Sequence, residues 1–188
     1  MTPFEFFFAL ISIITSLALT QLIAGGVAII RHRERGGLSV AHAVWMWIAF
    51  AVVIGNWGAL WGVRVDPDWP PLRVLGWLIS MTSLYAFCAL VVPEVERGTQ
   101  LNLKDFHEGE GRRYIIAHNL FSALAICLVL LISGLSPDRM HLLLPPIGAL
   151  ALGTIALFTR GRLQLIVSVL LAILATSFML TNINIAAT

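Results

Sequence analysis

Long apolar runs separated by short polar connectors form the main pattern along the chain. A helix needs about 20 mostly apolar residues to cross a hydrocarbon core about 30 Å thick. The runs are continuous and lack alternation with a period of two, so they predict helices rather than the strands of a barrel. We expect six membrane-spanning helices, over residues 4–30, 39–63, 71–92, 114–135, 141–159 and 163–185.

The composition supports a chain that lies almost wholly in lipid. Of the 188 residues, 59% are hydrophobic and 12% are charged, whereas soluble domains are about 45–50% apolar and about 25% charged. A chain this small has too much surface to hide so many apolar side chains from water. The sequence therefore predicts one all-α, polytopic six-helix membrane domain over residues 1–188, and it excludes a soluble enzyme domain and a nucleic-acid reader.

Two segments depart from this regular plan. The stretch 141–159 is the shortest and contains Pro145 and Pro146, which disrupt a helix interior. We expect it to span the membrane with a bent start, and the alternative is a short or re-entrant helix. The stretch 94–113 is polar and contains Gly98, Gly109 and Gly111, so we expect a flexible loop there.

Basic residues predict the orientation. Nine of the 12 lie in the first, third and fifth connectors or at their edges, and three lie on the opposite side. Because positive charge accumulates on the cytoplasmic face, the loop 94–113 is expected to be cytoplasmic and both termini periplasmic. We therefore predict a multi-pass protein of the bacterial inner membrane.

Polar residues inside the first helix form a candidate lining for a water path or a subunit contact. They recur at roughly helical spacing. Asn56 in the second helix is a further buried polar residue that needs a partner. The alternative interpretation is that the hydroxyls bond back to carbonyls of their own helix. The stripe consists of Glu5, Ser12, Thr15, Ser16, Thr20 and Gln21.

His42 and His118 are the candidate ligands for a cofactor. Each lies near the cytoplasmic start of its predicted helix, and we expect both rings about 5–8 Å below that entry. Two imidazoles at matched depth could ligate haem b, bind a divalent metal or relay protons. The alternative is that they are separate structural histidines. Because we favour separate structural histidines, we expect no cofactor, and haem b is the alternative.

Small residues predict packing seams, because they let two membrane helices approach closely. In the second helix Gly55 precedes the pair Gly58 and Gly62, and in the fifth helix Ala149 and Gly153 are spaced in the same way. These seams could lie within the bundle or between subunits.

Three functions are compatible with these features. We favour a homo-oligomeric channel or small carrier, because one chain of this size has little room for a pore of its own. The alternatives are a non-catalytic subunit or partner of a larger membrane complex, and a haem-b redox protein. The expected partners are lipid and either further copies of the chain or another membrane protein. An enzyme is disfavoured, since no nucleophile, base and acid converge in the sequence.

Overall fold

The apolar runs of the sequence form long helices, because in lipid a backbone must satisfy its own hydrogen bonds. The structure is a computed structural model, which describes residues 3–32, 37–64, 69–94, 101–133 and 137–187. Within these ranges the fold is helical, and six helices are long and apolar enough to cross a membrane, as predicted. The elements are α1 (Pro3–His32), α2 (Val40–Gly62), α3 (Pro71–Val91), α4 (Leu103–Ser133), the 3₁₀ helix η1 (Pro137–Leu143), α5 (Leu144–Phe158) and α6 (Gly161–Ala187).

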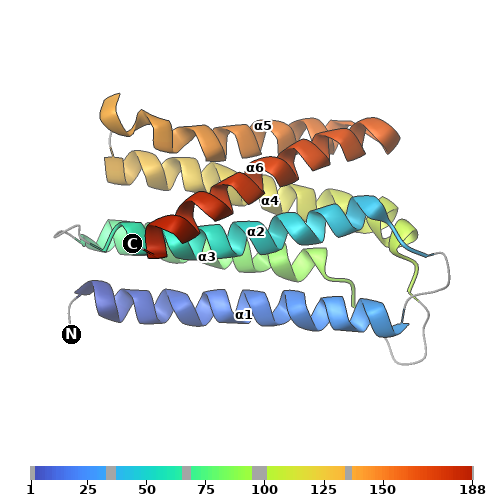
Figure 1. The fold of residues 1–188 in the computed structure, drawn as a ribbon, viewed down its shortest axis with the longest axis horizontal. Helices are drawn as coiled ribbons and strands as arrows, with labels where there is room; N and C mark the ends of the chain where they lie inside the picture. The colour runs from blue at the N-terminus through green and yellow to red at the C-terminus, as the bar shows by residue number, and fades with distance from the viewer. Residues whose placement is uncertain (1–2, 33–36, 65–68, 95–100, 134–136, 188) are drawn as a thin grey trace.

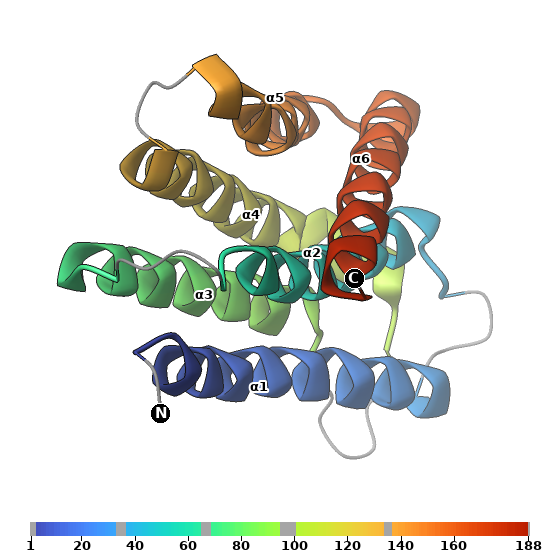
Figure 2. The ribbon, with the colours of Figure 1, turned by 60° about the vertical axis from the view of Figure 1, so that its left-hand side comes forward.

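Helix α2 lies at the centre of the arrangement. Successive long helices alternate in direction, so the N- and C-termini lie at the same end of the bundle (Figure 1). Helices α1 and α5 form opposite edges, and α6 crosses α2 obliquely (Figures 1 and 2). Because α2 contacts α1, α3, α4 and α6, it is the most buried of the six helices, whereas α5 is the least buried.

The largest helix–helix contact joins α2 to α6 across two glycines. A Cβ added at Gly55 would lie 2.5 Å from Cδ1 of Phe178, and one added at Gly58 would lie 2.7 Å from the backbone oxygen of Asn182. The two helices can therefore cross at this distance only because both positions lack a side chain. Gly62, the third member of the predicted seam, is the last residue of α2.

The predicted seam of α5 lies against α4. A Cβ at Gly153 would lie 3.0 Å from Nδ1 of His118 and would also overlap the side chain of Asn119. Ala149, one turn earlier, is half-buried and packs against the hydrophobic core. Gly153 thus brings α5 directly beside the polar residues in the middle of α4.

Helix α4 begins much earlier than the sequence predicts. The expected loop 94–113 is wrong for residues 103–113, which form the first turns of α4; residues 95–100 lie outside the described parts of the chain. The side chain of Asn102 accepts a hydrogen bond from the backbone N–H of Lys104 at 3.0 Å, which satisfies a donor at the helix start. Glu110 and Arg113 form an i, i+3 ion pair at 2.5 Å on the exposed surface. The cap at Asn102 and the Glu110–Arg113 ion pair therefore help to offset the low helix propensity of Gly109 and Gly111.

The fifth span has the bent start expected of it. The 3₁₀ helix η1 leads into α5 without a break, and the two prolines fall in the first turn of α5. Backbone N–H groups in a first turn have no partner within the helix, so prolines are tolerated there.

Aromatic side chains gather at the end of the bundle that carries the termini. Phe4 and Phe7 of α1 contact Trp69 at ring-centroid distances of 5.4 and 5.3 Å, and Phe8 contacts Trp57 and Trp61 at 5.9 and 5.4 Å. Tryptophan is typical of the membrane–water boundary. The opposite end contains His42 and His107, near the starts of α2 and α4.

We expect Gly58→Ala to destabilise the protein by about 1–3 kcal/mol, because its Cβ would press against the backbone of α6 rather than a movable side chain. Gly26→Ala is the matched control, since nothing lies within 4 Å of its Cβ. The control should be neutral or more stable by up to about 1 kcal/mol. Reversible unfolding in mixed detergent micelles measures both values. Equal stability of the two variants would contradict the tight α2–α6 contact.

Candidate functional site

His118 lies in the middle of α4 and is fully enclosed by protein. Its side chain is 1% exposed. The imidazole contacts Trp45 of α2 at a centroid distance of 5.5 Å and Phe87 of α3 at 5.4 Å, both edge to face. Helices α2 and α3 therefore cover this ring, Gly153 of α5 lies beside its Nδ1, and the titratable group is enclosed by protein.

One nitrogen of His118 has no hydrogen-bond partner. Nδ1 contacts the amide oxygen of Asn119 at a long 3.4 Å, and because that oxygen only accepts, Nδ1 is the donor. In the neutral ring Nε2 is then an acceptor, and it is buried without a partner among the described residues. The indole N–H of Trp45, whose ring contacts His118, is also buried without a partner. Buried polar groups are normally satisfied, so these two atoms are the strongest candidate for a functional site in this part of the bundle.

His42 is held differently, by a bond between helices. Its Nε2 donates to the carbonyl of Val91 at 2.9 Å, and Val91 is the last residue of α3, whose carbonyl has no partner within the helix. Ser39 caps α2 by accepting from the backbone N–H of His42 at 3.3 Å. His42 thus joins the start of α2 to the end of α3.

The two predicted ligands are not at matched depth and do not share a gap. His118 lies beside Trp45, one turn deeper along α2 than His42. Tyr114 contacts both His42 and Trp45, at centroid distances of 6.4 and 5.6 Å, so aromatic rings connect the two histidines. Since His42 also uses Nε2 on Val91, these residues do not fit a bis-histidine haem site. Within the described residues, no group of three or more His, Cys, Asp or Glu side chains could hold a metal ion.

The inner face of α4 carries a line of mainly polar residues, of which the sequence had indicated only His118 as a site residue. The hydroxyl of Tyr114 is hydrogen bonded to Nδ1 of His107, and a Cβ at Gly111 would lie 3.4 Å from that nitrogen. Ser122 donates to the carbonyl of His118 at 3.0 Å. The spacing i, i+4, i+7, i+11 and i+15 places all five residues on one face. We call this set the α4 polar face; it consists of His107, Gly111, Tyr114, His118 and Ser122.

The expected polar stripe of α1 does not form a common lining. Thr15 is buried and donates to the carbonyl of Ile11, whereas Ser16 is exposed and donates to that of Ser12. Asn56 of α2 likewise donates to its own helix, at Val52. Backbone bonding at i−4 therefore satisfies these groups. Of the others, Glu5 and Thr20 are exposed, Gln21 is half-buried, and the hydroxyl of Ser12 is buried without a partner among the described residues.

A polar pair joins α4 to α5 near His118. The amide nitrogen of Asn119 donates to the hydroxyl of Thr154 at 3.4 Å, and Thr154 is exposed. Both residues belong to helices that are candidate spans, and Thr154 lies four residues before the end of α5. Their hydrogen bond links the exposed side of α5 to α4.

No protein-family model, curated protein or solved structure matches this chain. The interpretation of the site therefore depends on its residues.

We expect His42→Leu to destabilise the protein by about 1–3 kcal/mol, because the buried carbonyl of Val91 would lose its donor. His42→Gln keeps a donor of similar reach and should lose less. Unfolding of both variants in mixed micelles measures the difference. If the Leu variant is as stable as the Gln variant, the α2–α3 bond has no structural role.

Proposed function

We propose that the protein is a small membrane transport protein that carries protons, with His118 as the group that binds the proton within the membrane. The observation that carries this proposal is the unpartnered Nε2 of His118 in the middle of α4. A buried acceptor nitrogen on a titratable ring is a position at which a proton can bind. Since aromatic rings contact His118, the site suits a proton or a water molecule better than a larger solute.

The α4 polar face supports a route from one end of the bundle to this site. His107 is half-buried near the start of α4 and is hydrogen bonded to Tyr114, which lies four residues before His118. Histidine and tyrosine side chains both donate and accept hydrogen bonds, as a proton relay requires. A proton that enters at His107 and passes to Tyr114 would therefore need one further transfer, from Tyr114 past Trp45, to reach His118.

The inner face of α4 beyond Ser122 favours a carrier over an open channel. There the same helical spacing continues with Ala125 and Val129, which are apolar, and Ala125 packs against the hydrophobic core. A continuous wet pore would need polar or roomy surfaces on this side as well. We infer that a proton bound at His118 leaves after a movement of helices or along a contact between subunits.

The orientation follows from the distribution of basic residues. We infer that the end with His107 faces the cytoplasm, because nine of the 12 basic residues belong to connectors and helix ends on that side. Both termini would then be periplasmic, in the inner membrane of a bacterium. In this orientation the α4 polar face opens toward the cytoplasm.

The Asn119–Thr154 pair supports self-association. It lies at the surface of the least buried helix, and an interhelical hydrogen bond to another copy would remove it from lipid. We therefore propose a homo-oligomer in which α4 and α5 form the contact between subunits. Another membrane protein on this surface is the alternative.

We expect vesicles containing the wild-type protein to acidify when a potassium gradient with valinomycin drives protons inward. His118→Asn should reduce the initial rate at least about tenfold, because an amide hydrogen bonds but does not take up a proton. An enclosed pH-sensitive dye measures the rate.

His141→Asn is the matched control, since His141 is exposed at the opposite end of the bundle and should leave the rate unchanged. Elution from a sizing column and the circular dichroism spectrum show whether each variant is folded. If vesicles with the wild-type protein acidify no faster than vesicles without protein, the proposed function is wrong. A folded His118→Asn variant with full activity would reject the site.

We expect Thr154→Val to weaken self-association about threefold, the equivalent of the ~0.6 kcal/mol typical of an interhelical hydrogen bond in a membrane. Thr82→Val is the control, because Thr82 is also exposed but donates to its own helix at Leu78. Energy transfer between labelled copies in vesicles measures the dissociation constant. A monomer that co-purifies with a different membrane protein would support the alternative partner.

A further inference from the structure

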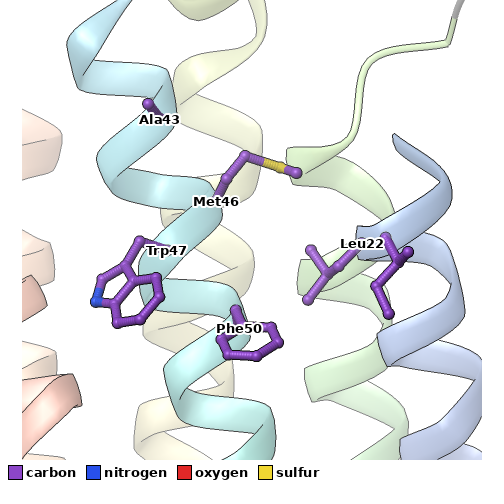
Figure 3. Close-up of a pocket in the computed structure, with 6 residues that line it drawn as sticks. Leu22, Ala43, Met46, Trp47 and Phe50 are labelled. Carbon is purple, nitrogen blue, oxygen red and sulfur yellow. The ribbon is translucent and has the colours of Figure 1, made fainter. Parts of the chain in front are cut away.

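An apolar groove lies between α1 and α2, separate from the site around His118. It is an open groove with a volume of about 360 Å³. Figure 3 shows Met46 and Phe50 of α2 extending toward Leu22 of α1, with Trp47 on the other side of α2 and Ala43 one turn above Trp47. The sixth lining residue is Ile23. Because α1 and α2 are both candidate spans, the groove is open to the hydrocarbon of the membrane.

Contacts outside the groove hold both of its walls in place. The indole N–H of Trp47 donates to the hydroxyl of Thr176 on α6 at 2.9 Å, and the ring of Phe50 stacks on Trp47 at a centroid distance of 5.7 Å. On the other wall Leu22 is 4% exposed, and Gly25, one turn later, lies tightly against Val92. These contacts preform the groove, so an occupant does not have to order its walls.

The volume and the apolar lining of the groove are compatible with one hydrocarbon chain. A helix with its side chains is about 10–12 Å across, and a cavity of about 360 Å³ between two neighbouring helices does not accommodate one. An acyl chain is unbranched and apolar, as the lining is. The surrounding lipid also supplies such chains at high concentration.

Positive charge lies where the headgroup of such a lipid would be. Arg31 and His32 are exposed in the last turn of α1, and the chain continues with two more arginines and one glutamate. At a rise of about 1.5 Å per residue, Arg31 is about 14 Å along α1 from Leu22. Ala43 is three residues from the start of α2 at the same end of the bundle. An acyl chain lying in the groove would therefore extend to this basic end of the bundle.

We propose that the groove binds one acyl chain of an anionic phospholipid, whose phosphate is held by the basic end of α1. The groove recognises the chain and the charge selects the headgroup. This site is independent of the proposed proton transport, since none of its lining residues belongs to the α4 polar face.

Native mass spectrometry of the full chain in detergent, titrated with phosphatidylglycerol or phosphatidylcholine, tests the proposal. We expect one tightly bound phosphatidylglycerol, preferred about fivefold over phosphatidylcholine, and Arg31→Gln should abolish that preference. Ala43→Trp, at an exposed position, fills the groove and should weaken binding at least about tenfold. Ile23→Trp fills it from the opposite wall and serves if the first variant does not fold.

Ala151→Trp is the matched control, because Ala151 is exposed on α5, away from the groove, and should leave binding unchanged. Three results would overturn the proposal. These are equal binding of the two lipids, unchanged phosphatidylglycerol binding in a folded groove-filling variant, or a co-purified polypeptide that cross-links to the groove in place of lipid.

Discussion

The close crossing of α6 over α2 is the contact on which the rest of the structure depends. At Gly55 and Gly58 the backbone of α2 lies directly against Phe178 and Asn182 of α6, because α2 has no side chain at these positions. In a membrane, helices gain little from burying apolar surface against each other, so packing of this kind provides much of the association. The crossing fixes α2 at the centre of the bundle. It also brings α6 within reach of Trp47, whose bond to Thr176 holds the wall of the groove.

Around that centre, most polar groups are satisfied locally. Thr15, Ser16 and Asn56 bond to carbonyls of their own helices, which requires no partner elsewhere. His42 bonds to the end of a neighbouring helix. The Nε2 of His118 and the indole N–H of Trp45 are buried without such a partner among the described residues, as are the hydroxyls of Ser12 and Ser168 and the indole N–H of Trp77, but only the first two belong to rings that contact each other. An unmade hydrogen bond in the interior costs about 1–3 kcal/mol, and groups that carry this cost are where a functional interpretation has most physical support.

The number and extent of the spans could be predicted from sequence, because hydropathy depends on composition within one segment. The start of α4 could not, since Gly109 and Gly111 indicate a loop while the side chain of Asn102, which caps the helix, lies outside the apolar pattern. That error concealed the α4 polar face. If residues 94–113 form a loop, helical spacing does not relate His107 to His118, and the two are not expected on one face. Extending the helical spacing back from His118 through Tyr114 to His107 would have found it. The relation of His42 to His118 was beyond reach, because it depends on how α2 and α4 pack.

Helix α2 carries two different surfaces within its first three turns. His42 and Trp45 point inward to α3 and α4, whereas Ala43, Met46, Trp47 and Phe50 line the groove beside α1. The inward contacts are rings and one hydrogen bond, and the outward ones enclose a cavity. A movement of α2 that separated Trp45 from His118 would therefore also change the width of the groove. Helix α2 therefore contributes to both surfaces through different residues: Trp45 covers His118, whereas Met46 and Phe50 line the groove.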